Sequence, residues 1–375
     1  GPERSSVLAV LVAVALAAAC GRFGGSAVPP PGSGLPPATT APSGSYVPGE
    51  IVVKYRSDST PRSLGFGRVV RTASSATGGF AFALVKVPEG QEAEYISRYA
   101  SQPNVEYAEL NLIRTRVDGE RVTVTGSNYG TQGEGAQGAI SPTDPKLSEF
   151  NAAFQVVKLD GTTVPSSEAT VQWDMHRIRA PAAWSSVDGS GVKVAITDEG
   201  VDCTHPQLSG KCLEGYDAVD DRVISPGENS DTGGHGTHVA GTVGAKADGV
   251  DMVGVAPGVQ IIPIRVLGPT GGTLFMVVTG MIKAADLGCR VFNASWGGNV
   301  GSRAELDAIL YAIGKGCVPV FAAGNAFSPS NQPTYPASFA ATVAGMFSVA
   351  SSTPTDRVST FSSAGRHVTV AAPGE

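Results

Sequence analysis

Hydrophobic and polar positions follow two different periods along this chain. Between residues 46 and 117, the stretches 50–55, 80–87 and 104–113 are apolar in the manner of strands, and 80–87 alternates clearly. Residues 92–100 repeat apolar positions at near-helical spacing. This first segment therefore predicts a compact α+β unit over residues 46–117.

From Trp173 onward, short apolar runs alternate with longer stretches of helical period. The predicted strands are 192–198, 260–267, 290–295 and 318–323, and the predicted helices are 238–245, 275–287 and 304–314. Such alternation is typical of an α/β fold, a parallel sheet with helices on both faces, which we assign to residues 170–375. Chemistry in such sheets lies at the carboxyl ends of the strands, where Asp198, Ser295 and Asn325 each close a predicted strand.

The segments outside these two units have different compositions. Residues 1–20 contain a short apolar run after Arg4 and small residues before Cys20, which is typical of an export signal and too short for a bilayer-spanning helix. Residues 17–20 resemble a lipobox, so Cys20 would carry a lipid anchor; the alternative is ordinary cleavage after Ala19. Residues 21–45 form a predicted disordered linker, and 118–169 a linker or insertion. We expect a secreted protein or a cell-envelope lipoprotein.

Charge narrows the classes of partner. The formal net charge is −6, and the sequence lacks a long basic run or a basic–aromatic pattern. These features argue against nucleic acid as the main partner.

Three polar residues are candidates for chemistry. Asp198 ends a hydrophobic strand and precedes a glycine turn, a place where a carboxylate is held rigidly enough to orient a histidine. His235 opens a helix of small residues, and Asn325 presents an amide after another strand. Each alone could be structural. His235 and His238 could also ligate zinc, but the His-Glu-x-x-His pattern that would support it is missing.

Six short motifs in a fixed order carry a family resemblance. They are Asp198-x-Gly200, His235-Gly236-Thr237-His238-Val239-Ala240-Gly241, Gly254-Val255-Ala256-Pro257, Ser295-Trp296-Gly297-Gly298, Ala323-Gly324-Asn325 and Tyr335-Pro336-Ala337. At these positions the sequence resembles the subtilisin-like serine peptidases, the subtilases. Asp198 and His235 follow the order that the Asp-His-Ser triad has along the chain in that family.

The resemblance implies a role for each candidate. Asp198 would orient His235, His235 would be the general base and acid, and Asn325 would donate to the oxyanion. Two segments would pair with an extended peptide substrate: Gly271, Gly272 and Thr273, and Ser295, Trp296 and Gly297. No cofactor is required. Gln207 stands where a carboxylate often holds calcium, with Asp248 in the matching loop, so a structural calcium would bind only weakly.

The same resemblance interprets the first unit as a propeptide that assists folding and occupies the substrate groove with its C-terminal tail. A separate adhesion module is the alternative. The sequence contains no Gly-Thr-Ser, the segment that carries the nucleophile in the family. We therefore expect the serine to lie beyond Glu375 and expect residues 1–375 alone to be inactive. Glu199, directly after Asp198, would favour a basic residue near the cleavage site.

Four cysteines form an even set within the second unit. Cys289 and Cys317 each precede a predicted strand, and Cys203 and Cys212 bracket one loop. Of the three connectivities we favour Cys203–Cys212 and Cys289–Cys317, with four buried thiols as the alternative. The sequence thus predicts a serine endopeptidase precursor that acts on proteins or peptides; the rival hypothesis is a nucleophile-free, membrane-tethered relic that binds or inhibits.

Overall fold

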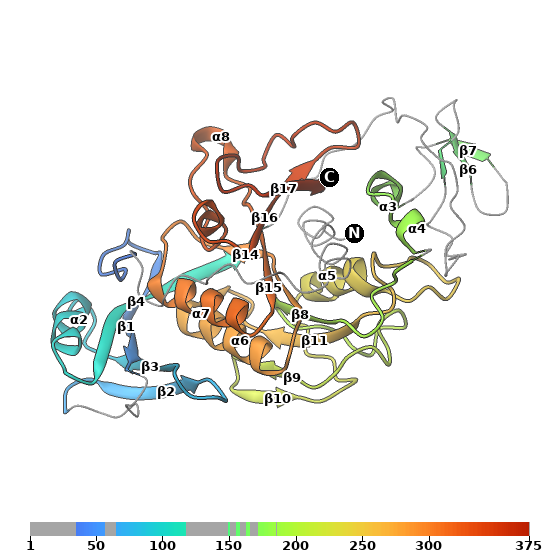
Figure 1. Cartoon of the computed structure of the whole chain (residues 1–375). Helices are drawn as coiled ribbons and strands as arrows, with labels where there is room; N and C mark the ends of the chain where they lie inside the picture. Colours follow the sequence, from blue (N-terminus) through green and yellow to red (C-terminus); the bar gives the residue numbers. More distant parts are fainter. Residues whose placement is uncertain are drawn as a thin grey trace.

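Two units pack against each other in the computed structural model, which describes residues 35–56, 65–117, 172–184 and 186–374 together with three short strands within 149–165. The first unit, within residues 35–117, is an antiparallel sheet with one helix (Figure 1), and we call it the prodomain after the propeptide that the family resemblance implies. Its elements are β1 (Tyr46–Tyr55), β2 (Arg68–Ser74), β3 (Ala81–Lys86), α2 (Glu92–Ala100) and β4 (Val105–Arg116). The spatial order is β4-β1-β3-β2.

The second unit is built on an eight-stranded sheet in the order β10-β9-β11-β8-β13-β15-β16-β17. All neighbours pair in parallel from β9 to β17, and only β10 is antiparallel to its neighbour. The strands are β8 (Lys193–Asp198), β9 (Gly215–Asp217), β10 (Arg222–Ile224), β11 (Gln260–Arg265), β13 (Val291–Ala294), β15 (Val318–Ala322), β16 (Phe347–Ser352) and β17 (Val370–Pro373).

Helices cover both faces of this sheet, as predicted. They are α5 (His235–Gly244) on one face and α6 (Leu274–Asp286) and α7 (Arg303–Gly314) on the other (Figure 1). Alternate residues of β8 show the division: Val194 and Ile196 pack in the cluster under α5, whereas Ala195 packs in the cluster under α6 and α7. Shorter elements complete the unit: β12 (Gly272–Thr273), β14 (Trp296–Gly297), α3 (Trp173–Arg177), α4 (Ala180–Ala183), α8 (Phe327–Ser330) and a 3-10 helix (Ala337–Ala341).

The prodomain and the second unit share one hydrophobic core. Tyr55 and Phe82 of the prodomain lie in the same buried cluster as Phe275 of α6 and Ala308 of α7. Burial of this kind supplies the main favourable free energy of association between folded units. The prodomain is therefore docked through a core-like contact and not merely tethered by its chain.

The disulfide pairing chosen from the sequence is confirmed. Cys203 is bonded to Cys212, and Cys289 to Cys317. The second bond joins the residues that precede the parallel neighbours β13 and β15.

One sequence expectation needs correction. Residues 35–45, assigned to a disordered linker, lie against the prodomain: Ala38 is buried, and its backbone pairs with Glu109 and Leu110. A prediction from apolar content missed the order of this segment, because backbone hydrogen bonds and one small buried side chain are enough to hold it. Within 118–169, β5 (Glu149–Phe150), β6 (Gln155–Val157) and β7 (Thr163–Pro165) form a small antiparallel sheet. The export-signal prediction at 1–20 lies outside the described residues.

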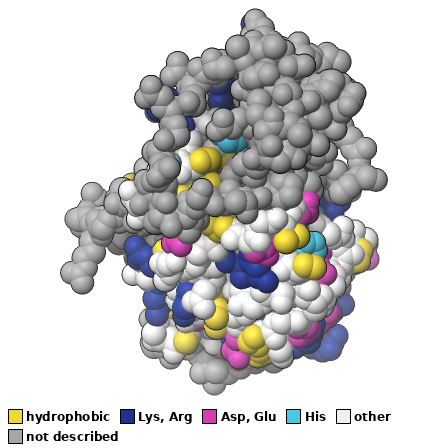
Figure 2. Space-filling view, turned by 90° about the vertical axis from the view of Figure 1, so that its right-hand side faces the viewer, with side chains coloured by type: hydrophobic (Ala, Val, Ile, Leu, Met, Phe, Trp, Pro, Cys, Tyr) yellow, Lys and Arg dark blue, Asp and Glu magenta, His cyan; other side chains and the backbone are white. Residues whose placement is uncertain are grey.

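The described surface is mixed in character. On the face shown in Figure 2, basic, acidic and apolar side chains are interspersed in small groups among the described residues. Among the described helices, none combines the length and apolar character needed to cross a bilayer.

Candidate active site

Asp198 and His235 meet at the carboxyl end of β8. The Nδ1 atom of His235 lies 2.7 Å from Oδ1 of Asp198, and both side chains are buried. The same Oδ1 accepts the backbone N–H of Glu199 at 2.8 Å. A carboxylate held in this way fixes both the orientation and the tautomer of an imidazole. The contact that the sequence required is therefore formed.

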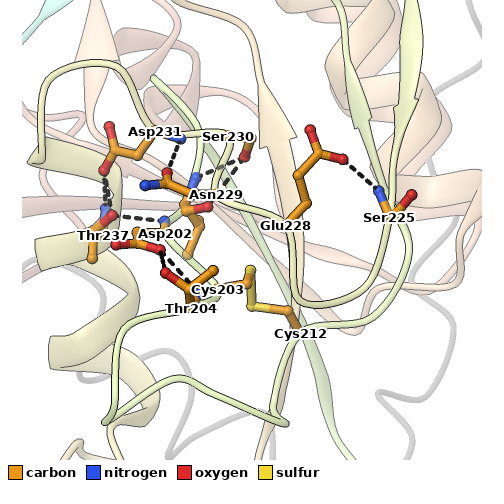
Figure 3. Close-up of a disulfide and its surroundings, with 11 residues drawn as sticks. Asp202, Cys203, Thr204, Cys212, Ser225, Glu228, Asn229, Ser230, Asp231 and Thr237 are labelled. Atoms are coloured by element: carbon orange, nitrogen blue, oxygen red, sulfur yellow. Dashed lines mark hydrogen bonds between the residues drawn. A yellow bond between two sulfur atoms is a disulfide. The ribbon is translucent and has the colours of Figure 1, made fainter.

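The first turn of α5 is held in place by Asp231 (Figure 3). Its Oδ1 accepts the N–H groups of Gly233 and Gly234 at 3.0 and 2.9 Å, and its Oδ2 accepts the N–H of Thr237 at 2.8 Å. The Thr237 hydroxyl in turn accepts the N–H of Asp202 at 2.8 Å. A carboxylate at a helix N-terminus is stabilised by the unpaired N–H groups there. Asp231 thus fixes the backbone on both sides of His235. This role was not predicted from the sequence.

Two glycines let α5 approach the turn after β8. Gly200 adopts a φ of 106°. A β-carbon added at Gly236 would lie 1.9 Å from the carbonyl oxygen of Gly200, closer than any side chain can approach. The motif glycines are therefore needed to bring His235 within bonding distance of Asp198.

The end of the prodomain strand β4 lies between the two predicted peptide-binding segments. On one side, β12 pairs antiparallel with it, Gly272 opposite Arg114 and Thr273 opposite Ile113. On the other, β14 pairs antiparallel with it, Trp296 opposite Arg116 and Gly297 opposite Thr115. We call residues 113–117 the tail and the space between β12 and β14 the groove. The tail thus makes the third strand of a small sheet.

The segments β12 and β14 pair with the tail through their backbones. The Trp296 side chain is buried, with Nε1 donating to the Thr197 carbonyl at 3.0 Å. The Thr273 hydroxyl caps α6 by accepting from Met276 N at 3.5 Å. Gly271 has a φ of 99°, and a β-carbon there would lie 2.5 Å from the Arg114 carbonyl. The groove therefore requires glycine at this edge.

The tail ends at a pocket beside Asn325. The N–H of Val117 donates to the carbonyl of Ser295 at 3.0 Å, and Val117 lines the pocket together with residues 322–325 and 349–351. Gly324, with a φ of 111°, makes the turn that presents Asn325, and a β-carbon there would lie 2.0 Å from Thr334 Oγ1. Asp198, His235, Asn325 and both edge segments are thus gathered at one edge of the sheet.

Comparisons with known proteins find relatives for both units. The family model described as "Subtilase family" matches residues 189–375, and the one described as "Fervidolysin N-terminal prodomain" matches residues 34–111. Thermitase of Thermoactinomyces vulgaris is 42% identical over 205 residues, which cover 54% of this chain and 70% of thermitase. This chain belongs to the subtilase family.

Fervidolysin of Fervidobacterium pennivorans resembles this subtilase in both units. The sequences are 42% identical over 202 residues, 51% of this chain and 28% of fervidolysin. The crystal structure of fervidolysin, described as a keratinolytic enzyme related to subtilisin, has a TM-score of 0.67 and 29% identity, covering 89% of this chain and 48% of that chain. This subtilase therefore spans less than half of fervidolysin.

The prodomain of this subtilase also caps two helices of the peptidase unit. Oε1 of Glu109 accepts the hydroxyl of Ser302 at 2.7 Å and the N–H of Ala304 at 2.9 Å, while Oε2 accepts the N–H groups of Arg303 at 3.2 Å and Ala38 at 2.9 Å. Two residues further along β4, Asn111 Oδ1 accepts the N–H of Phe275 at 3.1 Å. Successive same-face positions of one strand thus stabilise the N-termini of α7 and α6. These caps were not predicted, because their partners are distant in sequence.

The residues expected for calcium do not suit a bound cation as arranged in this subtilase. The amide Nε2 of buried Gln207 donates to Asp248 Oδ1 at 3.1 Å and to the Val250 carbonyl at 2.7 Å. These oxygens are of the type calcium prefers, but a donor already faces them. Across the described part of the chain, no group of three or more His, Cys, Asp or Glu side chains is placed to hold a metal.

Proposed function

We propose that this chain is the precursor of a serine endopeptidase in which Asp198 and His235 form two thirds of an Asp-His-Ser triad. The observation that carries the proposal is the 2.7 Å contact between these side chains, directly beside a groove that holds an extended peptide. The serine is supplied by a segment that follows Glu375 in the complete protein. The proposal also rests on the family membership given above.

The chemistry follows from the geometry. With Nδ1–H donating to Asp198, the lone pair of His235 is left on Nε2, which accepts the proton of the attacking hydroxyl. Asp198 then stabilises the imidazolium, and the same proton passes from Nε2 to the leaving amine. Asn325, after β15, donates to the oxyanion, a contribution worth about 10²–10³ in rate. Acid, base and donor are all side chains, so this hydrolysis requires no cofactor.

The groove accounts for the preference for internal peptide bonds. A substrate that replaces the tail would pair with β12 and β14 through its main chain on both sides, independently of its side chains. The prodomain thus acts as an inhibitor that is bound in the manner of a substrate. The two disulfides support export to an oxidising compartment. A lipid anchor at Cys20 and a signal at 1–20 remain predictions.

Activity-based labelling tests the proposal. The full-length native protein should react with a fluorophosphonate probe. Labelling should fall by about 10⁴-fold in the Asp198→Asn variant, because the amide keeps the shape of the site but favours the wrong tautomer of His235. The downstream DNA should encode Gly-Thr-Ser-Met-Ala in frame. If the full-length protein resists the probe and a stop codon follows Glu375 directly, the rival hypothesis of a peptide-binding relic replaces this one.

A further inference from the structure

The tail presents two arginines to two carboxylates of the groove. Arg116 Nη1 lies 3.3 Å from both carboxylate oxygens of Glu199, the residue after Asp198. Arg114 makes a two-pronged contact with Glu305 of α7, at 2.5 Å from Nε to Oε1 and 2.7 Å from Nη2 to Oε2. Thr115, between the two arginines, is exposed. Carboxylates of the second unit therefore contact Arg114 and Arg116, and Thr115 between them faces solvent.

Both carboxylates are built into the peptidase unit. Glu305 is 0% exposed and Glu199 is 5% exposed. Gly233 leaves the space that the Glu199 carboxylate occupies, since a β-carbon there would lie 2.2 Å from Oε2. Likewise, a β-carbon at Gly298 would lie 2.7 Å from Nη1 of Arg114. The groove is thus shaped around an acid at one position and a guanidinium at the other.

Departure of the tail would leave these carboxylates without their cations. A ligand that covers Glu199 and Glu305 again without bringing positive charge would desolvate each carboxylate with no partner, which is strongly unfavourable. Burial already raises the pKa of Glu199, while Arg116 acts in the opposite direction. A ligand that enters the groove therefore binds best if it brings positive charge to the same two places.

The third contact of the tail has a different chemistry. The pocket that Val117 helps to line is otherwise formed by small or uncharged residues, among them Ala322, Gly324, Ala350 and Ser351. The tail therefore meets carboxylates at Arg114 and Arg116 and an uncharged surface at Val117.

We propose that the groove selects peptides with basic residues at the two positions that Arg114 and Arg116 occupy, and that Glu305 and Glu199 are the specificity-determining residues. This inference rests on the proposed function, because it takes the tail to lie as a substrate does. The preferred segment is basic–any–basic followed by a small apolar residue, and arginine is favoured over lysine at the first position because Glu305 is contacted by both prongs of the guanidinium.

One competing role for Glu305 is local. Ser302 and Glu305 have the spacing of a helix capping box, and Ser302 Oγ accepts the N–H of Glu305 at 3.2 Å. A capping role alone would leave peptide selectivity unchanged when Glu305 is replaced. The two roles are therefore separable by measuring binding.

Peptide binding to the whole chain tests the proposal without requiring hydrolysis. The Arg114→Met/Arg116→Met variant carries a weakened tail, and a fluorescent peptide Ile-Arg-Thr-Arg-Val should bind to it at least about tenfold more tightly than Ile-Met-Thr-Met-Val, by anisotropy, because a charge-assisted contact is lost at each position. Adding Glu199→Gln should remove the preference for arginine at the second position, tested with Ile-Met-Thr-Arg-Val. Adding Glu305→Gln should remove it at the first, tested with Ile-Arg-Thr-Met-Val.

A measurement on the attached tail covers the case in which a variant folds poorly. By hydrogen exchange, Arg116→Met and Glu199→Gln should each speed exchange of the tail amides, and the double variant should add little, because both remove one pair. Thr115→Met is the matched control and should leave exchange unchanged. Equal binding of the arginine and methionine peptides, or binding of neither, would overturn the proposal. Failure of fluorophosphonate labelling with intact arginine selectivity would instead defeat the proposed peptidase and leave the groove's preference standing.

Discussion

Replacing Glu109 by glutamine should loosen the contact between prodomain and peptidase unit more than any surface change. The two carboxylate oxygens each accept two hydrogen bonds from donors on α7 and on the segment before β1. Glutamine keeps one oxygen and turns an NH₂ group toward the donors that faced the other. Two buried donors are then unpaired.

The magnitude follows from these contacts. Each buried donor left without a partner costs about 1–3 kcal/mol. For the two donors together we expect a total of about 2–6 kcal/mol, which should lower the Tm by at least about 2 °C in a chain of this size.

The assay compares the thermal unfolding of three proteins: the unmodified chain, Glu109→Gln and a control. Glu106→Gln is the control, because Glu106 is on the same strand but 27% exposed, with contacts of 3.3 Å to Lys54 and 3.2 Å to Arg303. It should change stability by no more than about 1 kcal/mol. A Glu109→Gln protein that unfolds within 1 °C or so of the control would refute the argument from buried donors.

Other substitutions test other contacts. Burial raises the pKa of Glu199 above 4.5, so its contribution to stability is present at lower pH and is lost as the pH rises through the folded pKa. Arg116→Gln removes a cause that lowers this pKa and should enlarge the loss of Tm with rising pH. The enlarged loss should disappear when Glu199 is also replaced. Gln207→Asp places a second carboxylate beside Asp248, and should lower the Tm without calcium and restore it with calcium; a Tm indifferent to calcium contradicts this. Gly236→Ala should destabilise by about 1–3 kcal/mol in denaturant unfolding, and unchanged stability would show that α5 can shift freely.

The strands and helices that carry the site were predictable because each combines a clear period with an end signal. The helix predicted at 275–287 is observed at Leu274–Asp286, and Asp198 does end its strand. In contrast, β2 and β16 were missed. β2 is largely half-exposed, with one buried residue, and β16 ends in serines, so neither has a strong apolar pattern.

The partners of the site residues were less predictable than the residues themselves. The meeting of Asp198 and His235 was expected from the motif order, and the fold brings them together. The cap that Asp231 makes at α5 was not predicted. The contact between Arg114 and Glu305 spans 191 positions of the sequence, and no local pattern records a contact of that range. Long-range pairs of this kind are fixed by the packing of whole units.

Strand β4 connects the prodomain strands with β12 and β14 of the second unit, so the folding of the prodomain and the blocking of the groove are coupled. Its first part pairs with β1 at the edge of the prodomain strands, and its last residues pair with β12 and β14 in the groove. A cut after the tail would leave the blocking segment anchored by the intact prodomain sheet. Under the proposed function, the groove would therefore open only as fast as the prodomain unfolds or is digested, and the stability of the prodomain core would set that delay.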